Sequence, residues 1–141
     1  MRAILGALMM GALLAGTSAS AEILNFRAML APPAETPPGQ RHGAGLAELT
    51  LDTDSKVLSW KVTYSGLTGP LTGAHFRAPP EPGSPVGATM DLAPLLTNPV
   101  VSSARLNDIQ IGDLRAGLWS VNLLTAKNPH GELRGDLERA P

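Results

Sequence analysis

The 141-residue chain contains no cysteine, which excludes disulfides, thiolate metal ligands and thiol catalysis. Aromatic residues make up only 4% and charged residues only 16%, so the chain is neither a coiled coil nor a charge-rich disordered tail. The formal net charge is −1, and without a basic excess we expect no nucleic-acid binding. What the chain does have is 15 glycines and 13 prolines, which predict a single, turn-rich domain.

Only one long apolar run is present, at residues 3–15, directly after Arg2. Small residues at Ala19 and Ala21 follow it, as signal peptidase requires, and the run is too short to span a bilayer. Residues 1–21 are therefore predicted to be a signal peptide, with a buried N-terminal helix as the alternative. We expect a periplasmic or extracellular domain of residues 22–141 without a transmembrane anchor.

Alternation of apolar and polar residues predicts β-strands in the rest of the chain. The clearest is Val57–Ser65, whose apolar face consists of Leu58, Trp60, Val62 and Tyr64. Residues 45–51 alternate in the same way, and residues 52–55 (DTDS) suit a hairpin connection between the two strands. Further strands are predicted at residues 23–30, 71–77, 119–124 and 133–137.

Proline-rich segments at residues 31–39 and 78–85 are predicted to be extended, polyproline-like loops. Residues 109–116 fit either a helical turn or an irregular stretch, and no long amphipathic helix is evident. Short strands separated by such turns predict an all-β fold, a single-domain antiparallel Greek-key-like β-sandwich with Pro/Gly-rich loops.

Several motifs occur in an order that is similar to one family. They are Phe26-x-Ala28-x-Leu30, AETPP at 34–38, Gly43-x-Gly45-x-Ala47, GLTG at 66–69, AHFR at 74–77, AGLWSVNLLT at 116–125 and NPHGELRG at 128–135. Together they resemble the CHRD (chordin) domain over nearly all of residues 23–137. The resemblance implies a secreted β-sandwich similar in fold to copper–zinc superoxide dismutase.

The family pattern has three histidines where this chain has His75, Arg77 and Leu124. Side chains at i and i+2 of a strand share a face, so the family pattern suits a metal ion. Here a guanidinium repels a cation and leucine has no donor atom, so we expect neither a metal cofactor nor a catalytic residue. His75 is the residual metal candidate, although a half-buried, hydrogen-bonded histidine is favoured. His42 and His130 are predicted to be solvated turn residues, with a three-histidine site as the alternative.

A polar cluster is predicted to include His75, Arg77, Asn122, Glu132 and Arg134. We interpret Glu132 and Arg134 as an ion pair on one strand surface; recognition of a charged partner is the alternative. Asn122 is expected to bond a turn backbone, and Gly131 and Gly135 to allow a tight turn and close backbone approach.

The sequence contains no G-x-S-x-G, P-loop or H-E-x-x-H motif. We therefore expect no enzyme, but a secreted non-catalytic binding or scaffold module. Its partner would be an extracytoplasmic protein or matrix component that the sequence does not identify. The alternative is a copper- or zinc-binding, dismutase-like protein with a degenerate histidine site.

Overall fold

The computed structural model describes Gly11 and residues 22–80 and 87–141. The predicted signal peptide (Gly11 apart) and residues 81–86, which include most of the second proline-rich loop, lie outside the described residues. The described elements are β1 (Ile23–Leu30), the 3-10 helix η1 (Pro38–Gln40), β2 (Ala44–Asp52), β3 (Val57–Ser65), β4 (Leu71–Arg77), β5 (Thr89–Asp91), β6 (Val100–Arg105), α1 (Asp108–Arg115), β7 (Ser120–Thr125), β8 (Leu133–Asp136) and β9 (Glu138–Ala140). Among these residues, no helix is long and apolar enough to cross a bilayer.

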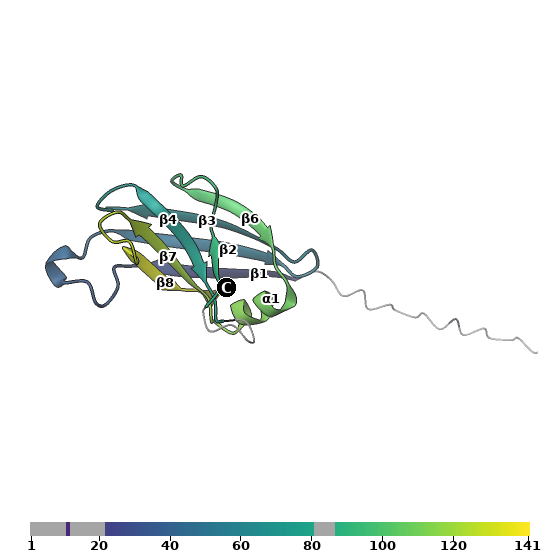
Figure 1. Ribbon diagram of the computed structural model, residues 1–141. Coiled ribbons are helices and arrows are strands. Elements are labelled where there is room, and N and C mark those ends of the chain that lie inside the picture. The colour runs from purple at the N-terminus through teal and green to yellow at the C-terminus, as the bar shows by residue number, and fades with distance from the viewer. Residues whose placement is uncertain (1–10, 12–21, 81–86) are drawn as a thin grey trace, which may run out of the picture.

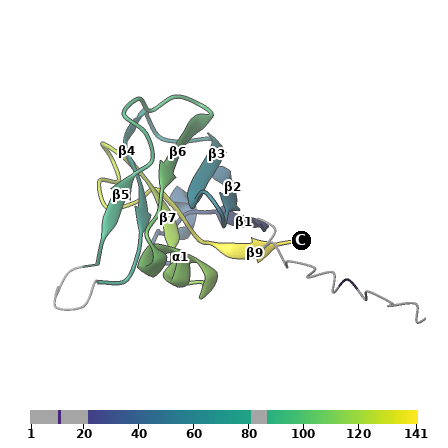
Figure 2. The same cartoon turned by 90° about the vertical axis from the view of Figure 1, so that its right-hand side faces the viewer.

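The strands form two antiparallel sheets that pack face to face (Figure 1). Sheet A has the order β6-β3-β2-β1-β9, and sheet B has the order β5-β4-β7-β8. The chain builds the β1–β2–β3 meander first and then changes sheets repeatedly, ending as β9 beside β1 (Figure 2). The prediction of an all-β antiparallel sandwich is confirmed.

The β2–β3 hairpin shows how local sequence sets this architecture. Its inward positions are apolar, and Ala47, Leu49, Leu58 and Val62 are all buried. At the turn, the Asp52 carboxylate accepts hydrogen bonds from the backbone N–H groups of Asp54 (2.9 Å) and Ser55 (3.2 Å). An aspartate that bonds its own turn in this way fixes the hairpin register, as the DTDS sequence predicts.

Three aromatic rings join the two sheets at the centre of the core. Trp60 of sheet A meets Phe76 of sheet B edge-on at 4.9 Å between ring centroids, and Phe76 lies 5.4 Å from Trp119. The Trp60 indole N–H donates to the Leu92 carbonyl at 2.9 Å, so even its polar atom is satisfied. Tyr64 is only half-buried, because its hydroxyl donates outward to the Thr97 carbonyl at 3.2 Å.

The first proline-rich loop is not wholly extended as predicted. Its last two residues belong to η1, which begins with Pro38, where the missing N–H costs a helix no hydrogen bond. Where β1 runs into this loop, Ala31 and Arg134 exchange two backbone hydrogen bonds of 3.0 and 2.9 Å. This bridge ties β1 of sheet A to β8 of sheet B along one side of the sandwich.

The other differences between the predicted and the observed secondary structure concern short elements. Residues 109–116, left open by the sequence, form most of α1, an eight-residue helix. The predicted strand 133–137 divides at Leu137, whose N–H bonds to the Trp119 carbonyl before the chain enters β9 in sheet A. Three strands, β5, β6 and β9, were not predicted. All three lie at sheet edges.

Candidate functional site

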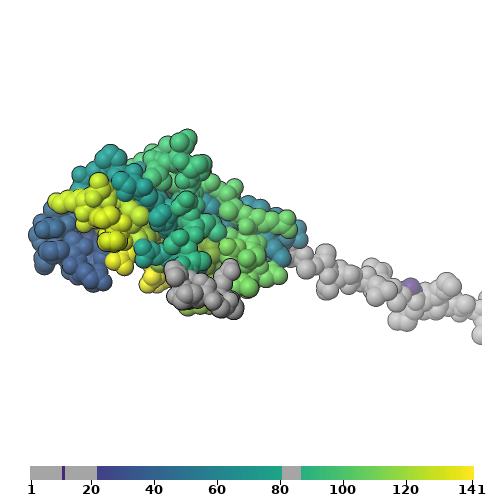
Figure 3. Space-filling view, in the orientation of Figure 1, coloured from purple at the N-terminus to yellow at the C-terminus, as the bar shows by residue number. Residues whose placement is uncertain are grey.

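The outer face of sheet B carries most of the predicted polar cluster. On β4, Ala74 and Phe76 point into the core, so His75 and Arg77 point outward. Strand pairing places His75 opposite Asn122, and Asn122 opposite Arg134 on β8. These three predicted residues therefore form one row across the sheet, with Arg77 in the next row opposite Ser120. Figure 3 shows the side of the molecule on which β4, β7 and β8 lie.

His75 is half-buried and has a carboxylate partner. Its side chain is 26% exposed, and its Nε2 atom lies 3.1 Å from Asp91 Oδ1 on the edge strand β5. The predicted half-buried position of His75 is confirmed, with a carboxylate as its neighbour. Asp91 was not among the predicted site residues. The only available signal was an isolated TMD triplet, which lacks the alternation of a longer strand.

Asp91 places one carboxylate beside His75, but the other two positions of the family's histidine pattern hold no metal ligand. Arg77 shares the face of His75, and Leu124 lies on β7 opposite Gly73, one step diagonally from His75. Neither a guanidinium nor an isobutyl group offers a lone pair to a metal ion. Within residues 22–80 and 87–141, no three histidine, aspartate or glutamate side chains gather closely enough to hold a metal. His42, His75 and His130 do not form such a group in this part of the chain.

Glu132 does not form the predicted ion pair with Arg134. It lies in the turn before β8 and is only 5% exposed. Its carboxylate accepts hydrogen bonds from the Thr68 backbone N–H (2.9 Å), the Thr68 hydroxyl, the Thr125 hydroxyl (2.9 Å) and the Asn128 amide (2.8 Å). These donors come from the β3–β4 loop, the end of β7 and the β7–β8 turn. Glu132 therefore ties three chain segments together.

These hydrogen bonds also govern the ionisation of Glu132. Burial by itself raises the pKa of the carboxyl, but the hydrogen bonds from Thr68, Asn128 and Thr125 favour its charged form and outweigh burial. The net effect is a pKa below the ordinary value of a glutamate. A buried carboxylate with this many donors is a structural anchor and is not available to an outside ligand.

Arg134 turns instead towards the first proline-rich loop. Its guanidinium nitrogen lies 3.8 Å from the Glu35 carboxylate, and both side chains are largely in contact with solvent. A hollow of about 330 Å³ lies beside this pair and is lined by residues that include Pro33, Ser120 and Asp136. Glu35 was not a predicted site residue, because the fold alone brings its loop next to β8.

Asn122 is completely buried beneath the β7–β8 turn. Its amide donates to the His130 carbonyl at 3.1 Å, which confirms the predicted bond to a turn backbone. Gly131 has a φ of 142° and lies so close that a Cβ atom would collide with the Asn122 side-chain oxygen. A Cβ atom at Gly135 would collide with the Met29 carbonyl. Both glycines thus allow the close approach that the sequence predicts.

Comparison with known proteins gives one match. A family model described as the CHRD domain matches residues 26–137, from β1 through Leu137. The matched segment includes the whole outer face of sheet B. Searches of curated proteins and of solved structures found no match.

Proposed function

This chain belongs to the CHRD domain family, and from that premise we propose that it is an exported, non-catalytic domain that binds another protein or a matrix component outside the cytoplasm. The observation that carries this proposal is the outer face of sheet B. Arg77 and Arg134 are exposed there, with the carboxylates of Asp91 and Asp136 on neighbouring positions. A surface of mixed charge is suited to selective recognition of a complementary protein surface.

The shape of this face also supports a binding role. A hollow of about 310 Å³ lies beside His75 and Asp91, and the hollow beside Arg134 has about 330 Å³. The two hollows border opposite edges of the four-stranded sheet, one at β5 and one at β8. A partner that spans both would contact all four strands of sheet B.

Export is supported by the sequence of residues 1–21, with its single positive charge, apolar run and small residues at Ala19 and Ala21. A non-catalytic role is supported by the replacement of family histidines by Arg77 and Leu124. Intact-mass measurement of protein recovered from the extracytoplasmic fraction tests export directly. The expected first residue is Glu22, and full-length chain confined to the cytoplasm would contradict the proposal.

Partner binding is tested with residues 22–141 as bait against extracytoplasmic extract. We expect a protein or matrix component to be captured and the capture to fall at least tenfold in the double variant Arg77→Glu/Arg134→Glu. The matched control is Arg27→Glu/Lys61→Glu, which reverses two exposed charges on the outer face of sheet A. Equal loss in both variants would show that the outer face of sheet B is not the binding surface.

A further inference from the structure

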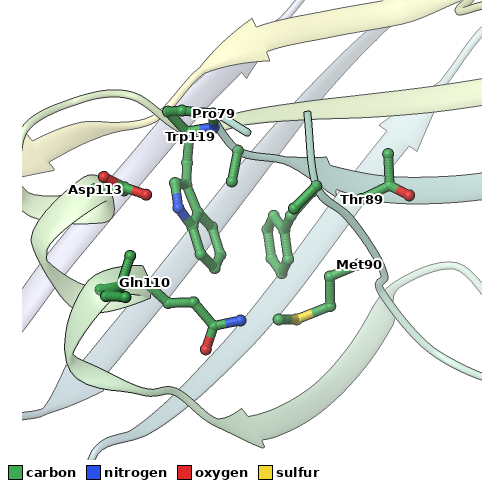
Figure 4. A pocket seen from close by; sticks show the side chains of 10 residues that line it. Pro79, Thr89, Met90, Gln110, Asp113 and Trp119 are labelled. Carbon is green, nitrogen blue, oxygen red and sulfur yellow. The ribbon is translucent and has the colours of Figure 1, made fainter. Parts of the chain in front are cut away.

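A separate cavity lies at the corner of the sandwich where α1 meets sheet B (Figure 4). It has a volume of about 160 Å³. Its walls come from the end of β4, from β5, from α1 and from Trp119; the described lining residues are Phe76, Ala78, Pro79, Ala88, Thr89, Met90, Ile109, Gln110, Asp113 and Trp119. The polar row of His75, Asn122 and Arg134 takes no part in it.

The size and walls of this cavity suit a single ring. An apolar protein cavity of about 150 Å³ is large enough to hold benzene. Phe76 and Trp119, whose ring centroids are 5.4 Å apart, line the cavity together with Met90, so a flat apolar ligand would find aromatic and thioether contacts. Figure 4 shows the Trp119 and Met90 side chains at this site. The apolar part of the ligand is therefore a six-membered ring or a group of similar size.

Two polar groups at the cavity indicate which substituent the ring of the ligand carries. The Trp119 indole nitrogen is buried and has no hydrogen-bond partner among the described atoms. It lies on the edge of the indole that faces Asp113 of α1 (Figure 4). Asp113 is also the one charged residue among the described lining residues. Because the nitrogen is buried in this conformation, a ligand hydroxyl reaches it only when a neighbouring side chain moves.

A hydroxyl group is the substituent that satisfies both groups. It accepts a hydrogen bond from the indole N–H and donates one to the carboxylate. An ammonium group has no lone pair for the indole, and a ligand carboxylate is repelled by Asp113. We propose that this cavity binds a phenol ring, either as a free small molecule or as a tyrosine side chain of the binding partner. Only the second source rests on the proposed function.

The test is a titration of the purified mature protein with phenol, followed by the indole N–H signals in nitrogen-15 NMR spectra. The chain has two tryptophans, and the Trp60 N–H is already bonded to Leu92, so it serves as an internal reference. We expect saturable one-to-one binding that shifts the Trp119 signal and leaves the Trp60 signal in place. Trp119→Phe identifies the signals.

Ligand and protein variants test the two polar contacts. Toluene lacks the hydroxyl and benzoate carries a negative charge, and we expect each to bind at least fivefold more weakly than phenol. Asp113→Asn should weaken phenol binding at least fivefold, whereas the exposed Asp54→Asn should leave it unchanged. The proposal is overturned if phenol does not saturate the protein, if toluene or benzoate binds as tightly, or if Asp113→Asn has no effect.

A third arm separates the two sources of the ring. If N-acetyltyrosinamide binds like phenol and N-acetylphenylalaninamide does not, the cavity accepts a tyrosine side chain. If phenol alone binds, the ligand is a free small molecule. Because these titrations need no partner, a failure of the capture experiment leaves their outcome intact.

Discussion

At the scale of single residues, Glu132 stabilises the fold through hydrogen bonds that its sequence pattern does not reveal. Its carboxylate accepts hydrogen bonds from Thr68, Thr125 and Asn128 while almost fully buried. Glu132→Gln replaces one carboxylate oxygen, which accepts hydrogen bonds, by an NH₂ group, which can only donate. This NH₂ group then faces the donor groups that the carboxylate oxygen had bonded. We expect a loss of about 2–3 kcal/mol in the free energy of unfolding, measured by urea denaturation. Glu48→Gln, at an exposed position of β2, should change it by no more than about 0.5 kcal/mol.

The same carboxylate should make stability depend on pH. The pKa of Glu132 is lowered in the folded protein from its ordinary value of 4.5. Its charged form therefore stabilises the fold above the unfolded-state pKa, and this contribution disappears as the pH falls through the lower folded-state pKa. The difference in stability between wild type and Glu132→Gln should accordingly shrink below about pH 4.5. A difference that stays constant from pH 7 to pH 3 would contradict this role.

Trp60 tests the aromatic centre of the core. Trp60→Ala removes the edge-on contact with Phe76 and the hydrogen bond to Leu92, and should cost about 3–5 kcal/mol in chemical denaturation. Trp60→Phe keeps a ring and should cost less. Val101→Ala, at a position 62% exposed on β6, serves as the control and should cost less than about 0.5 kcal/mol.

The alternation of apolar and polar residues along β3 correctly predicts which of its side chains are buried. Leu58, Trp60 and Val62 lie inward as their alternation predicts, because a β-strand places every second side chain on one face. The prediction that Glu132 shares a face with Arg134 requires Glu132 to lie in the strand, whereas β8 begins at Leu133. The turn at Gly131 breaks that period. No pattern within the segment reveals that Thr68, 64 residues away, supplies the donor.

At the scale of elements, α1 depends on its first turn. The Asn107 side chain accepts a hydrogen bond from the Gln110 N–H at 2.8 Å, and the Gln110 side chain accepts one from the Asn107 N–H at 2.9 Å. This reciprocal pair satisfies two N–H groups that a helix start leaves free. Asn107→Ala should therefore lower stability by about 1 kcal/mol, and Asn107→Gly by only a few tenths, in thermal unfolding.

Most predicted strands carry enough residues to show a period, although β6, with six residues, was not predicted. The capping pair of Asn107 and Gln110 was missed, although Asn followed three residues later by Gln is a start signal for a helix. In contrast, β5 and β9 have three residues each, too few for any alternation. They are specified by the strands beside them, β4 and β1, and a single sequence does not contain that pairing. A bridge between the two sheets, such as that of Ala31 with Arg134, cannot be predicted from a single sequence either, because the sequence does not show which segments become neighbours.

At the scale of the whole molecule, the two sheets have different outer faces. The outer face of sheet A alternates charges along one row, with Arg27, Glu48 and Lys61 on adjacent strands. The outer face of sheet B also has exposed charges, and in addition it carries His75, the buried Asn122 and the β7–β8 turn; the charged residues are Arg77, Asp91, Arg134 and Asp136. Because both faces carry exposed charges, a charge reversal on sheet A is a matched control for binding by sheet B.

The same face provides the last prediction, which concerns the metal site that the family pattern implies. His75 and Arg77 point outward from β4, and Leu124 points outward from β7 diagonally beside His75. Wild-type protein should bind Cu²⁺ or Zn²⁺ weakly in calorimetric titration, because Arg77 adds a positive charge and Leu124 adds no donor. Arg77→His/Leu124→His removes the guanidinium and supplies two imidazoles, so Cu²⁺ should bind clearly more tightly.

Adding His75→Ala to the double variant should abolish the gain, since His75 lies between the two new ligands along the face. Submicromolar, His75-dependent binding by the wild type would contradict the argument from Arg77 and Leu124. If the double variant gains nothing, the three positions are too far apart to share one ion. Positions 77 and 124 lie on opposite sides of position 75 along the strands, so convergence depends on the reach of the imidazoles from a twisted sheet. A gain in affinity would therefore mean that the backbone keeps the geometry of a metal site and that two side chains alone decide its use.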